Sequence, residues 1–260
     1  MKLLCSDYDG TLCFHDGVHT VDLDAIRRFR TAGHRFAVLT GRTWGVIIDE
    51  LCRWQIPYDY LVCNNGAVLV EGDRFVCRTI DPDIAVAMAD YFKTLPVAYY
   101  GLSNGTDISQ MTCRGEPGVA VYAASPRPLL SEREILSGGL VCGFYSIFKQ
   151  LSDTTYAARQ LKNRFGDYVE VLVSSDMSID IAPKGVNKSY GVRCLIQQHP
   201  FDDIYAIGDS LNDLDMLKAC NSFAIASGSL EIRSACDQVV NNVGECIDAL
   251  LGDESAAVNS

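Results

Sequence analysis

The 260-residue sequence lacks several features that would place it in a special class. It contains no C-x-x-C pair, no internal repeat, no low-complexity tract and no apolar run near the roughly 18 residues that a membrane span needs. Its eleven cysteines are scattered, which favours reduced thiols over a disulfide framework, and its four histidines show no zinc-like spacing. The first apolar run is too short for a signal peptide and is interrupted by Asp7. We therefore expect a cytoplasmic protein that does not enter a membrane.

Basic residues are also few. The chain has 22 Lys and Arg against 33 Asp and Glu, a formal net charge of −11. Such a field repels DNA and anionic lipid, which excludes nucleic acid as the main partner. A small anionic substrate remains compatible with it if a local cation offsets the charge. The hydrophobic content of 48% is ordinary for a globular protein, and the length allows one large domain or two smaller ones.

The first third of the chain alternates buried-type strands with helical segments. The pattern predicts strands over residues 2–6, 35–40 and 60–63, and helices over residues 20–32 and 43–54. Because the joints between them are short, this alternation indicates a parallel sheet covered on both faces.

The same alternation returns in the last third. Helices are predicted over residues 187–198, 210–220 and 243–251, with strands ending near Gly208 and over residues 222–227. The two outer thirds therefore form one α/β core with a Rossmann-like parallel sheet.

The middle third differs, because strands outnumber helices and their polar and apolar residues alternate more clearly. This pattern indicates an α+β module with mainly antiparallel strands, bracketed by Pro82 and Pro183. We expect residues 1–80 and 183–260 to form the core and residues 81–182 to form a second, inserted domain. Its expected helices cover residues 84–94 and 154–165, and its expected strands cover residues 97–102, 108–112, 119–123, 141–148, 168–173 and 177–182.

Polar side chains follow four of the core strands. In an open parallel sheet, ligands bind outside the carboxyl ends of the strands, so these side chains should meet at one edge. They are Asp7 and Asp9 after the first strand, Thr40 after the second, Asn64 and Asn65 after the third, and Asp209, Asn212 and Asp213 after the strand that ends at Gly208.

Asp7 and Asp9 should point the same way, because residues i and i+2 of an extended chain share a face. Turn formation explains Asp9-Gly10, and helix capping explains Asp209 or Ser210, but neither explains Asp7. Two neighbouring carboxylates repel each other unless one is protonated or a cation lies between them. An all-oxygen cluster of this kind suits Mg²⁺.

The expected site also offers groups that could hold an anion. Thr40 and Gly41 lie where a helix begins, although helix capping explains Thr40 equally well. Lys184 and Lys188 could each supply a point charge, although each alone reads as a surface lysine. A carboxylate nucleophile, a divalent cation and an anion cradle together indicate phosphoryl transfer.

Three motifs, in this order, resemble those of the haloacid-dehalogenase-like phosphatases. Residues 7–11 (DYDGT) match the pattern D-x-D-G-T, Thr40 in LTGR matches the second motif, and residues 208–213 (GDSLND) match G-D-x-x-N-D. The chain is most similar to the Cof-like branch with a type IIB cap. Residues 183–188 match the lysine motif of that branch, which selects Lys188 over Lys184, and residues 65–67 match its N-G-A motif.

The resemblance implies a Mg²⁺-dependent phosphatase that hydrolyses a small phosphorylated metabolite, such as a sugar phosphate, through an aspartyl-phosphate. It implies that Asp7 is the nucleophile and Asp9 the general acid and base. The cap, residues 81–182, would select the substrate. The implied metal site comprises Asp7, the backbone carbonyl of Asp9, Asp209 and, directly or through water, Asp213. The implied phosphate and substrate contacts are Thr40, Gly41, Asn65, Lys188 and Asn212.

Two departures from the family pattern and two alternatives stay open. Ser189 replaces a glycine, and the loop of residues 226–231 differs from the usual sequence. A phosphomutase or phosphotransferase would use the same scaffold, and a phospho-accepting signalling domain would share several groups. We expect a monomer or weak homodimer. Arg42 could contact substrate or lie on the surface, and five aromatic residues could line a sugar pocket or pack in the fold: Tyr99, Tyr100, Tyr122, Tyr145 and Phe148.

Overall fold

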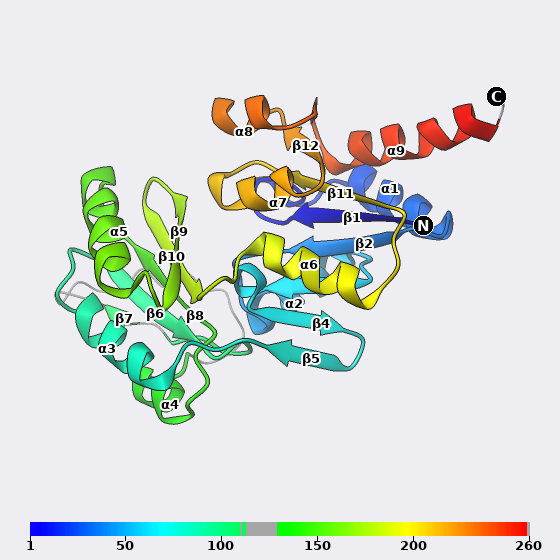
Figure 1. Cartoon of the computed structure of the whole chain (residues 1–260). Coiled ribbons are helices and arrows are strands. Elements are labelled where there is room, and N and C mark those ends of the chain that lie inside the picture. Colours follow the sequence, from blue (N-terminus) through cyan, green and yellow to red (C-terminus); the bar gives the residue numbers. More distant parts are fainter. Residues whose placement is uncertain (110, 113–128, 259–260) are drawn as a thin grey trace.

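The computed structural model of the chain describes residues 1–109, 111–112 and 129–258 and contains two sheets (Figure 1). The expected strand over residues 119–123, with Tyr122, lies outside the described residues. The expected fold class, a parallel-sheet core with an additional α+β unit, is confirmed. None of the described helices is long and apolar enough to cross a membrane.

The larger sheet has eight strands in the order β13-β12-β11-β1-β2-β3-β4-β5. Its strands from β13 to β3 are parallel, and β4 and β5 are antiparallel. Strand β1 lies between β11 and β2, so its carboxyl end lies beside theirs. The strands are β1 (Lys2–Asp7), β2 (Arg35–Leu39), β3 (Tyr60–Cys63), β4 (Val68–Glu71), β5 (Arg74–Cys77), β11 (Asp203–Gly208), β12 (Asn221–Ile225) and β13 (Gln238–Val240).

Helices cover both faces of this sheet, as the alternation along the chain predicts. Leu4 of β1 packs in a cluster with α1 (Thr20–Thr31), α2 (Trp44–Trp54) and α9 (Val243–Val258). Leu3 and Cys5, whose side chains point the opposite way, pack in a second cluster. That second cluster includes α6 (Lys188–Gln198), α7 (Leu214–Lys218) and α8 (Leu230–Ala235).

Two local features differ from the expectation. The segment between β3 and α3 forms the β4–β5 hairpin, which the sequence analysis left without an assignment. The predicted helix over residues 210–220 is also wrong as one element, because a short 3-10 turn over Leu211–Asp213 precedes α7. Ser210 and Asp213 form a capping box at the start of this turn, in which the Asp213 carboxylate accepts from the backbone N–H of Ser210, and 3-10 turns are common at helix ends.

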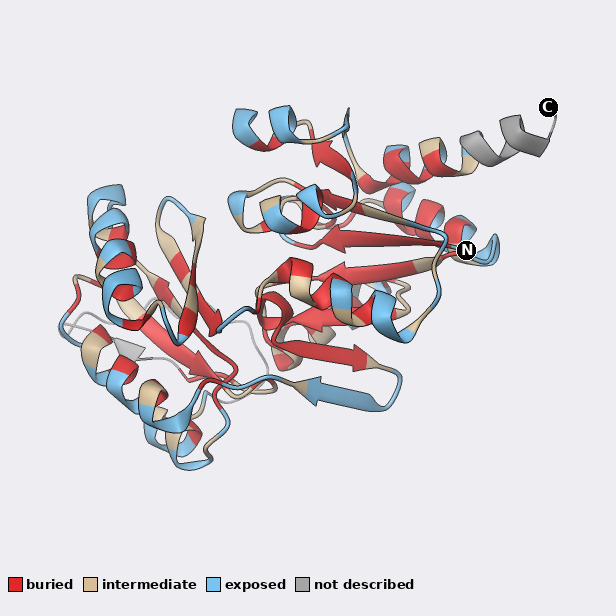
Figure 2. Ribbon diagram, viewed as in Figure 1, coloured by how far each residue is buried: buried red, intermediate tan, exposed pale blue. Residues whose placement is uncertain are grey.

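The second sheet has five antiparallel strands in the order β7-β6-β8-β10-β9. Three helices pack with it around a separate hydrophobic cluster, in which Tyr100 and Phe148 are fully buried (Figure 2). The start of the first helix follows from Asp81, whose side chain caps it, and from Pro82 at its first position. The elements are α3 (Pro82–Phe92), β6 (Tyr99–Ser103), β7 (Met111–Thr112), α4 (Glu132–Ser137), β8 (Gly143–Ile147), α5 (Leu151–Phe165), β9 (Val169–Ser175) and β10 (Ser178–Pro183).

Candidate active site

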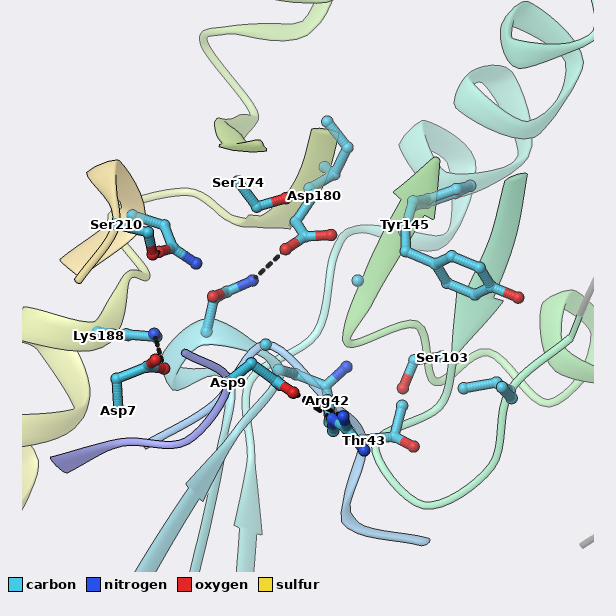
Figure 3. Close-up of a pocket in the computed structure, with 18 of the residues that line it drawn as sticks. Asp7, Asp9, Arg42, Thr43, Ser103, Tyr145, Ser174, Asp180, Lys188 and Ser210 are labelled. Carbon is cyan, nitrogen blue, oxygen red and sulfur yellow. Dashed lines mark hydrogen bonds and ion pairs between the residues drawn. The ribbon is translucent and has the colours of Figure 1, made fainter. Parts of the chain in front are cut away.

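A cavity of about 430 Å³ lies between the two sheets (Figure 3). The carboxyl ends of β1, β2, β3 and β11 lead into residues on one side of it, and the second sheet supplies the other side. Asp7 and Lys188 lie at one end, with Ser103 and Tyr145 toward the other. The core contributes Asp7, Asp9, Gly41, Arg42, Thr43, Asn64, Asn65, Lys188, Asp209, Ser210 and Asn212, and the second sheet with its loops contributes Ser103, Ile108, Gly143, Phe144, Tyr145, Ser174, Asp180 and Ile181.

Lys188 is buried at the floor of this cavity, between two carboxylates. Its Nζ donates to Asp7 Oδ1 and to Asp213 Oδ1, each at 2.5 Å, and its side chain is 2% exposed. The other candidate lysine, Lys184, lies elsewhere: its exposed side chain donates to the backbone carbonyl of Gly166 and pairs with Glu170. The position of Lys188 therefore agrees with the choice made from the lysine motif.

The charges at the floor do not balance. Burial raises the pKa of Asp7 well above its usual range, and the neighbouring Asp213 raises it further, while Lys188 lowers it. Burial also raises the pKa of Asp209. Burial lowers the pKa of Lys188, but Asp213 and Asp7 outweigh this, so its pKa lies above the ordinary lysine value and it stays protonated. One ammonium group thus faces three carboxylates, which leaves the cluster short of positive charge.

The same three carboxylates could hold a metal ion. Asp7, Asp209 and Asp213 each offer an oxygen atom, and these atoms lie within 4.8 Å of one another. Oxygen ligands of this type fit Mg²⁺, and a divalent cation would supply the missing charge. Glycine at position 10 is needed for the approach of Asp209, since a Cβ there would lie 2.6 Å from Asp209 Oδ2.

Asp213 differs from the other two carboxylates because its oxygens are already occupied. Oδ1 accepts from Lys188, and Oδ2 accepts from the backbone N–H groups of Asp209 and Ser210 at 3.2 and 3.1 Å. Asp213 is fully buried and does not line the cavity. Its contacts place it under Lys188 and the turn that carries Asp209, so Asp7 and Asp209 are the carboxylates better placed to meet an ion.

Asp9 lies beside Asp7 but faces a different partner. Its carboxylate is half exposed and forms a bidentate ion pair with Arg42, with distances of 2.9 and 2.6 Å. Arg42 lies over the ring of Tyr8, 5.1 Å from the centroid. Tyr8 is fully buried and donates its hydroxyl to Glu50 of α2. From the sequence, Arg42 could contact substrate or lie on the surface. In the structure, it contacts Asp9, the expected acid–base residue.

The turn after β2 places Thr40 and Gly41 differently. Thr40 is buried, its hydroxyl accepts from the backbone N–H of Arg42 at 3.1 Å, and it does not line the cavity. Gly41 lines the cavity, and a Cβ there would lie 3.2 Å from both Asn65 Nδ2 and Asp180 Oδ2. A glycine at this position therefore leaves room for the contact between those two side chains.

The turn after β3 brings Asn64 and Asn65 to the cavity in left-handed backbone conformations, with φ of 50° and 53°. Asparagine tolerates this region better than most residues. Asn65 Nδ2 donates to Asp180 of β10 at 3.0 Å, a contact between the two sheets. Asn212 also lines the cavity, and its Oδ1 accepts from the hydroxyl of Ser210.

Sequence reasoning missed the residues that the second sheet contributes. Asp180 and Ser174 come from β10 and β9, and Ser103 from β6. One signal was present: Asp180 is a carboxylate between two isoleucines on an alternating strand. Of the five aromatic candidates, Tyr145 lines the cavity, whereas Tyr100 and Phe148 pack in the core of the second sheet.

Residues 4–249 match the family model of haloacid dehalogenase-like hydrolases. The chain belongs to this family. The resemblance drawn from the motifs is thereby confirmed, and the protein is an enzyme of the phosphatase type within the family.

Individual relatives agree with this membership. YkrA of Bacillus subtilis, named as a candidate phosphatase, is 24% identical over 254 residues, covering 94% of this chain and 93% of YkrA. YwtE of Bacillus subtilis, a 5-amino-6-(5-phospho-D-ribitylamino)uracil phosphatase, is 24% identical over 307 residues, covering 98% and 100%. The structure of the subclass IIB sugar phosphatase BT4131 has a TM-score of 0.80 at 18% identity and covers 96% of this chain and 99% of that one. At this identity the structural likeness shows the fold.

Proposed function

We propose that this haloacid dehalogenase-like enzyme is a Mg²⁺-dependent phosphomonoesterase that acts on a small phosphorylated metabolite of the sugar phosphate class. The observation that carries the proposal is the buried cluster of Asp7, Lys188 and Asp213 with Asp209 beside it. It brings together the carboxylate that we propose as nucleophile, a buried ammonium group and the carboxylates that we propose as metal ligands. Catalysis of phosphoryl transfer depends mainly on such positioning and charge neutralisation.

Asp7 and Asp9 would divide the chemistry between them. A carboxylate oxygen of Asp7 attacks phosphorus, and the bond from phosphorus to the leaving oxygen breaks as Asp9 protonates that oxygen. Asp9 then takes a proton from the water that hydrolyses the aspartyl-phosphate. Asp9 must exchange its contact with Arg42 for the leaving oxygen during this cycle, since its carboxylate is bonded to that guanidinium.

Lys188, Gly41 and Asn212 are proposed to hold the phosphate, with Asn65 near the leaving group. A bound Mg²⁺, held by Asp7, Asp209 and the backbone carbonyl of Asp9, would neutralise phosphate charge in the transition state. Thr40 is proposed to shape this turn, since its hydroxyl accepts from the Arg42 N–H. Asp213 is proposed to hold Lys188 and the Asp209 turn in place.

The cavity supports a small, polar substrate. Its volume of about 430 Å³ lies toward the lower end of the range of about 300–1,000 Å³ that small-molecule sites occupy. The name of the relative YwtE gives it a substrate with a phosphorylated ribityl chain, which is a polyol.

We propose that residues 81–182 form the cap that selects the substrate and that residues 1–80 and 183–260 form the catalytic core. We also propose a cytoplasmic monomer or weak homodimer, a compartment that suits the free thiols of the ten described cysteines.

Asp7→Asn tests the assignment of the nucleophile. We expect turnover of p-nitrophenyl phosphate with Mg²⁺ to fall at least about a thousandfold, because an amide cannot form the phosphoenzyme. The circular dichroism spectrum and melting curve should show a folded protein. As a matched control, Asp248→Asn removes an exposed carboxylate of α9 that pairs with Arg28 and should leave turnover unchanged.

Retained turnover in a folded Asp7→Asn variant would contradict the assignment. Product analysis with a sugar bisphosphate and an added sugar monophosphate distinguishes the phosphomutase or phosphotransferase alternative. Transfer from the bisphosphate to a hydroxyl of the monophosphate, followed by transfer back from its other position, yields the isomeric monophosphate, regenerates bisphosphate and releases no inorganic phosphate. A phosphoenzyme that forms without turnover would indicate the signalling alternative.

A further inference from the structure

Asp180 is a carboxylate that the second sheet directs toward the core. It lies on β10 between Ile179 and Ile181, whose side chains pack in the hydrophobic cluster of the second sheet. Because side chains alternate along a strand, Asp180 projects from the opposite face, into the cavity. The side chain is therefore presented to the cavity that Asp7 and Lys188 also line.

The two oxygens of Asp180 have different surroundings. Oδ2 accepts a hydrogen bond from Asn65 Nδ2 at 3.0 Å, which fixes the orientation of the carboxylate. Figure 3 shows the other oxygen turned toward the side of the cavity where Tyr145 lies. The glycine at position 41 leaves room for this arrangement, since a Cβ there would come within 3.2 Å of Oδ2. The Asp180 carboxylate is thus bonded to Asn65 of the core and to Ser174 of β9, and it lines the cavity.

Asp180 is ionised at neutral pH despite its surroundings. Burial raises its pKa to about 6, and Asp9 adds a smaller increase, while hydrogen bonds from Asn65 and Ser174 and the charge of Lys188 lower it. The two cationic side chains that line the cavity have carboxylate partners: Lys188 with Asp7 and Asp213, and Arg42 with Asp9. The side of the cavity formed by the second sheet therefore carries an anionic acceptor, Asp180, while Lys188 and Arg42 are paired with other carboxylates.

We propose that Asp180 selects the leaving group: it accepts a hydrogen bond from a hydroxyl of a polyhydroxylated substrate and repels phosphate esters whose leaving group carries a carboxylate. This inference rests on the proposed phosphatase function and names a residue that determines specificity within it. Asp180 has no part in the bond-breaking step. Its effect falls on the KM of each substrate and on the ratio between substrates.

The test measures kcat/KM at pH 7.5 with Mg²⁺ for three esters: glucose 6-phosphate, 2-phosphoglycolate and p-nitrophenyl phosphate. The wild-type protein should prefer glucose 6-phosphate to 2-phosphoglycolate. Asp180→Asn should reduce this preference about tenfold to a hundredfold, the effect expected for one hydrogen bond to a charged group together with relief of repulsion. The change should appear as a higher KM for the sugar ester and a lower KM for 2-phosphoglycolate. The kcat for p-nitrophenyl phosphate should stay within about twofold, since the variant does not change the chemistry at Asp7.

The choice of asparagine and one control variant separate selection of the leaving group from a structural role. Asparagine at position 180 can still accept from Asn65 through its amide oxygen, so Asp180→Asn keeps the contact between the sheets and removes only the charge. Asp176→Asn removes one charge from the exposed turn of the same β9–β10 hairpin and should leave the preference unchanged.

Three outcomes would overturn the inference. The first is an unchanged preference in Asp180→Asn. The second is an equal loss of kcat/KM for all three esters in that variant, which would indicate a purely structural contact. The third is a wild-type protein that prefers 2-phosphoglycolate to glucose 6-phosphate. In each case, turnover of p-nitrophenyl phosphate by the wild-type protein leaves the phosphatase proposal standing. Absence of turnover with every ester overturns both.

Discussion

Lys188 is a residue of the candidate active site that also affects the stability of the fold. The ammonium group is almost fully buried and bonded to two carboxylates, at Asp7 and Asp213. Burying these charges has a large desolvation cost, which the short contacts between them offset. The arrangement is therefore stable only while all three groups are present, and removal of one leaves buried charge without a partner.

We expect Lys188→Met to lower the free energy of unfolding by about 3–5 kcal/mol, because it removes the shared partner of two buried carboxylates. Urea denaturation at pH 7.5 measures this loss. Lys184→Met is the matched control: this lysine is 53% exposed in its pair with Glu170, so its loss should be below about 1 kcal/mol. Equal losses in the two variants would contradict the buried ion-pair account.

Much of the site was predictable residue by residue, because short motifs fix both the residue type and the strand end that carries it. Asp7, Asp9, Lys188, Asp209 and Asp213 are brought together as the motifs imply. Asp180 was not predicted, because its role depends on how the second sheet faces the first. No local pattern encodes that relation.

Among the elements, helix α2 begins at a contact with the second sheet: its first backbone N–H groups donate hydrogen bonds to the turn that follows β6. The backbone N–H groups of Trp44 and Gly45 donate to the carbonyl oxygens of Gly105 and Thr106 at 3.1 and 3.0 Å. Thr43, the N-cap residue, makes no side-chain capping bond. Carbonyls from the 103–107 turn therefore satisfy two helix amides that are usually left to a cap side chain or water.

Gly105→Ala should destabilise this turn, because Gly105 has φ of +94° and a Cβ there would lie 3.1 Å from Cys142 Sγ and Val68 Cγ2. We expect a loss of about 2–3 kcal/mol from backbone strain and crowding together. Gly139→Ala is the matched control, since Gly139 also has positive φ, +69°, but its Cβ would meet nothing within 4 Å. That variant should lose about 1 kcal/mol. Thermal or urea unfolding gives both values, and a loss in Gly139→Ala as large as in Gly105→Ala would show that crowding is unimportant.

The elements themselves were predicted where hydrophobic periodicity is strong. The helices over residues 20–32 and 187–198 agree with α1 and α6 within one residue at each end. Strand β5 of the β4–β5 hairpin lacks a buried-strand signal, because three of its residues are exposed. The 3-10 turn before α7 was missed because hydrophobic periodicity does not distinguish a 3-10 first turn from an α-helical one.

For the whole molecule, negative charge is the main obstacle to binding an anionic substrate. The net charge of −11 and the acidic cluster at Asp7, Asp209 and Asp213 both oppose the binding of an anionic substrate. A divalent cation bound in the cluster would reverse this locally. Because such an ion binds the folded chain and not the unfolded one, it should also stabilise the whole fold.

We expect Mg²⁺ at about 100 times its dissociation constant to stabilise the metal-free protein by about 2.7 kcal/mol, which raises Tm by roughly 5–10 °C for a chain of this size. Differential scanning fluorimetry after EDTA treatment and dialysis measures the shift. Asp209→Asn should remove most of it, whereas Asp248→Asn, which changes the charge equally on α9, should keep it. An undiminished shift in Asp209→Asn would exclude this carboxylate as a ligand.

The position of β1 in the sheet has a consequence for the order in which the chain can fold during synthesis. The first strand pairs with β11, with Lys2 opposite Asp203 and Ser6 opposite Ile207. A ribosome must therefore complete about four-fifths of the chain before β1 and β11 can pair, whereas the five-stranded sheet can pair its own strands earlier. A nascent chain halted before β11 would carry Asp7 without the strand that leads to Asp209. The enzyme thus acquires the carboxylates that we propose bind Mg²⁺ as a set only when synthesis is nearly finished.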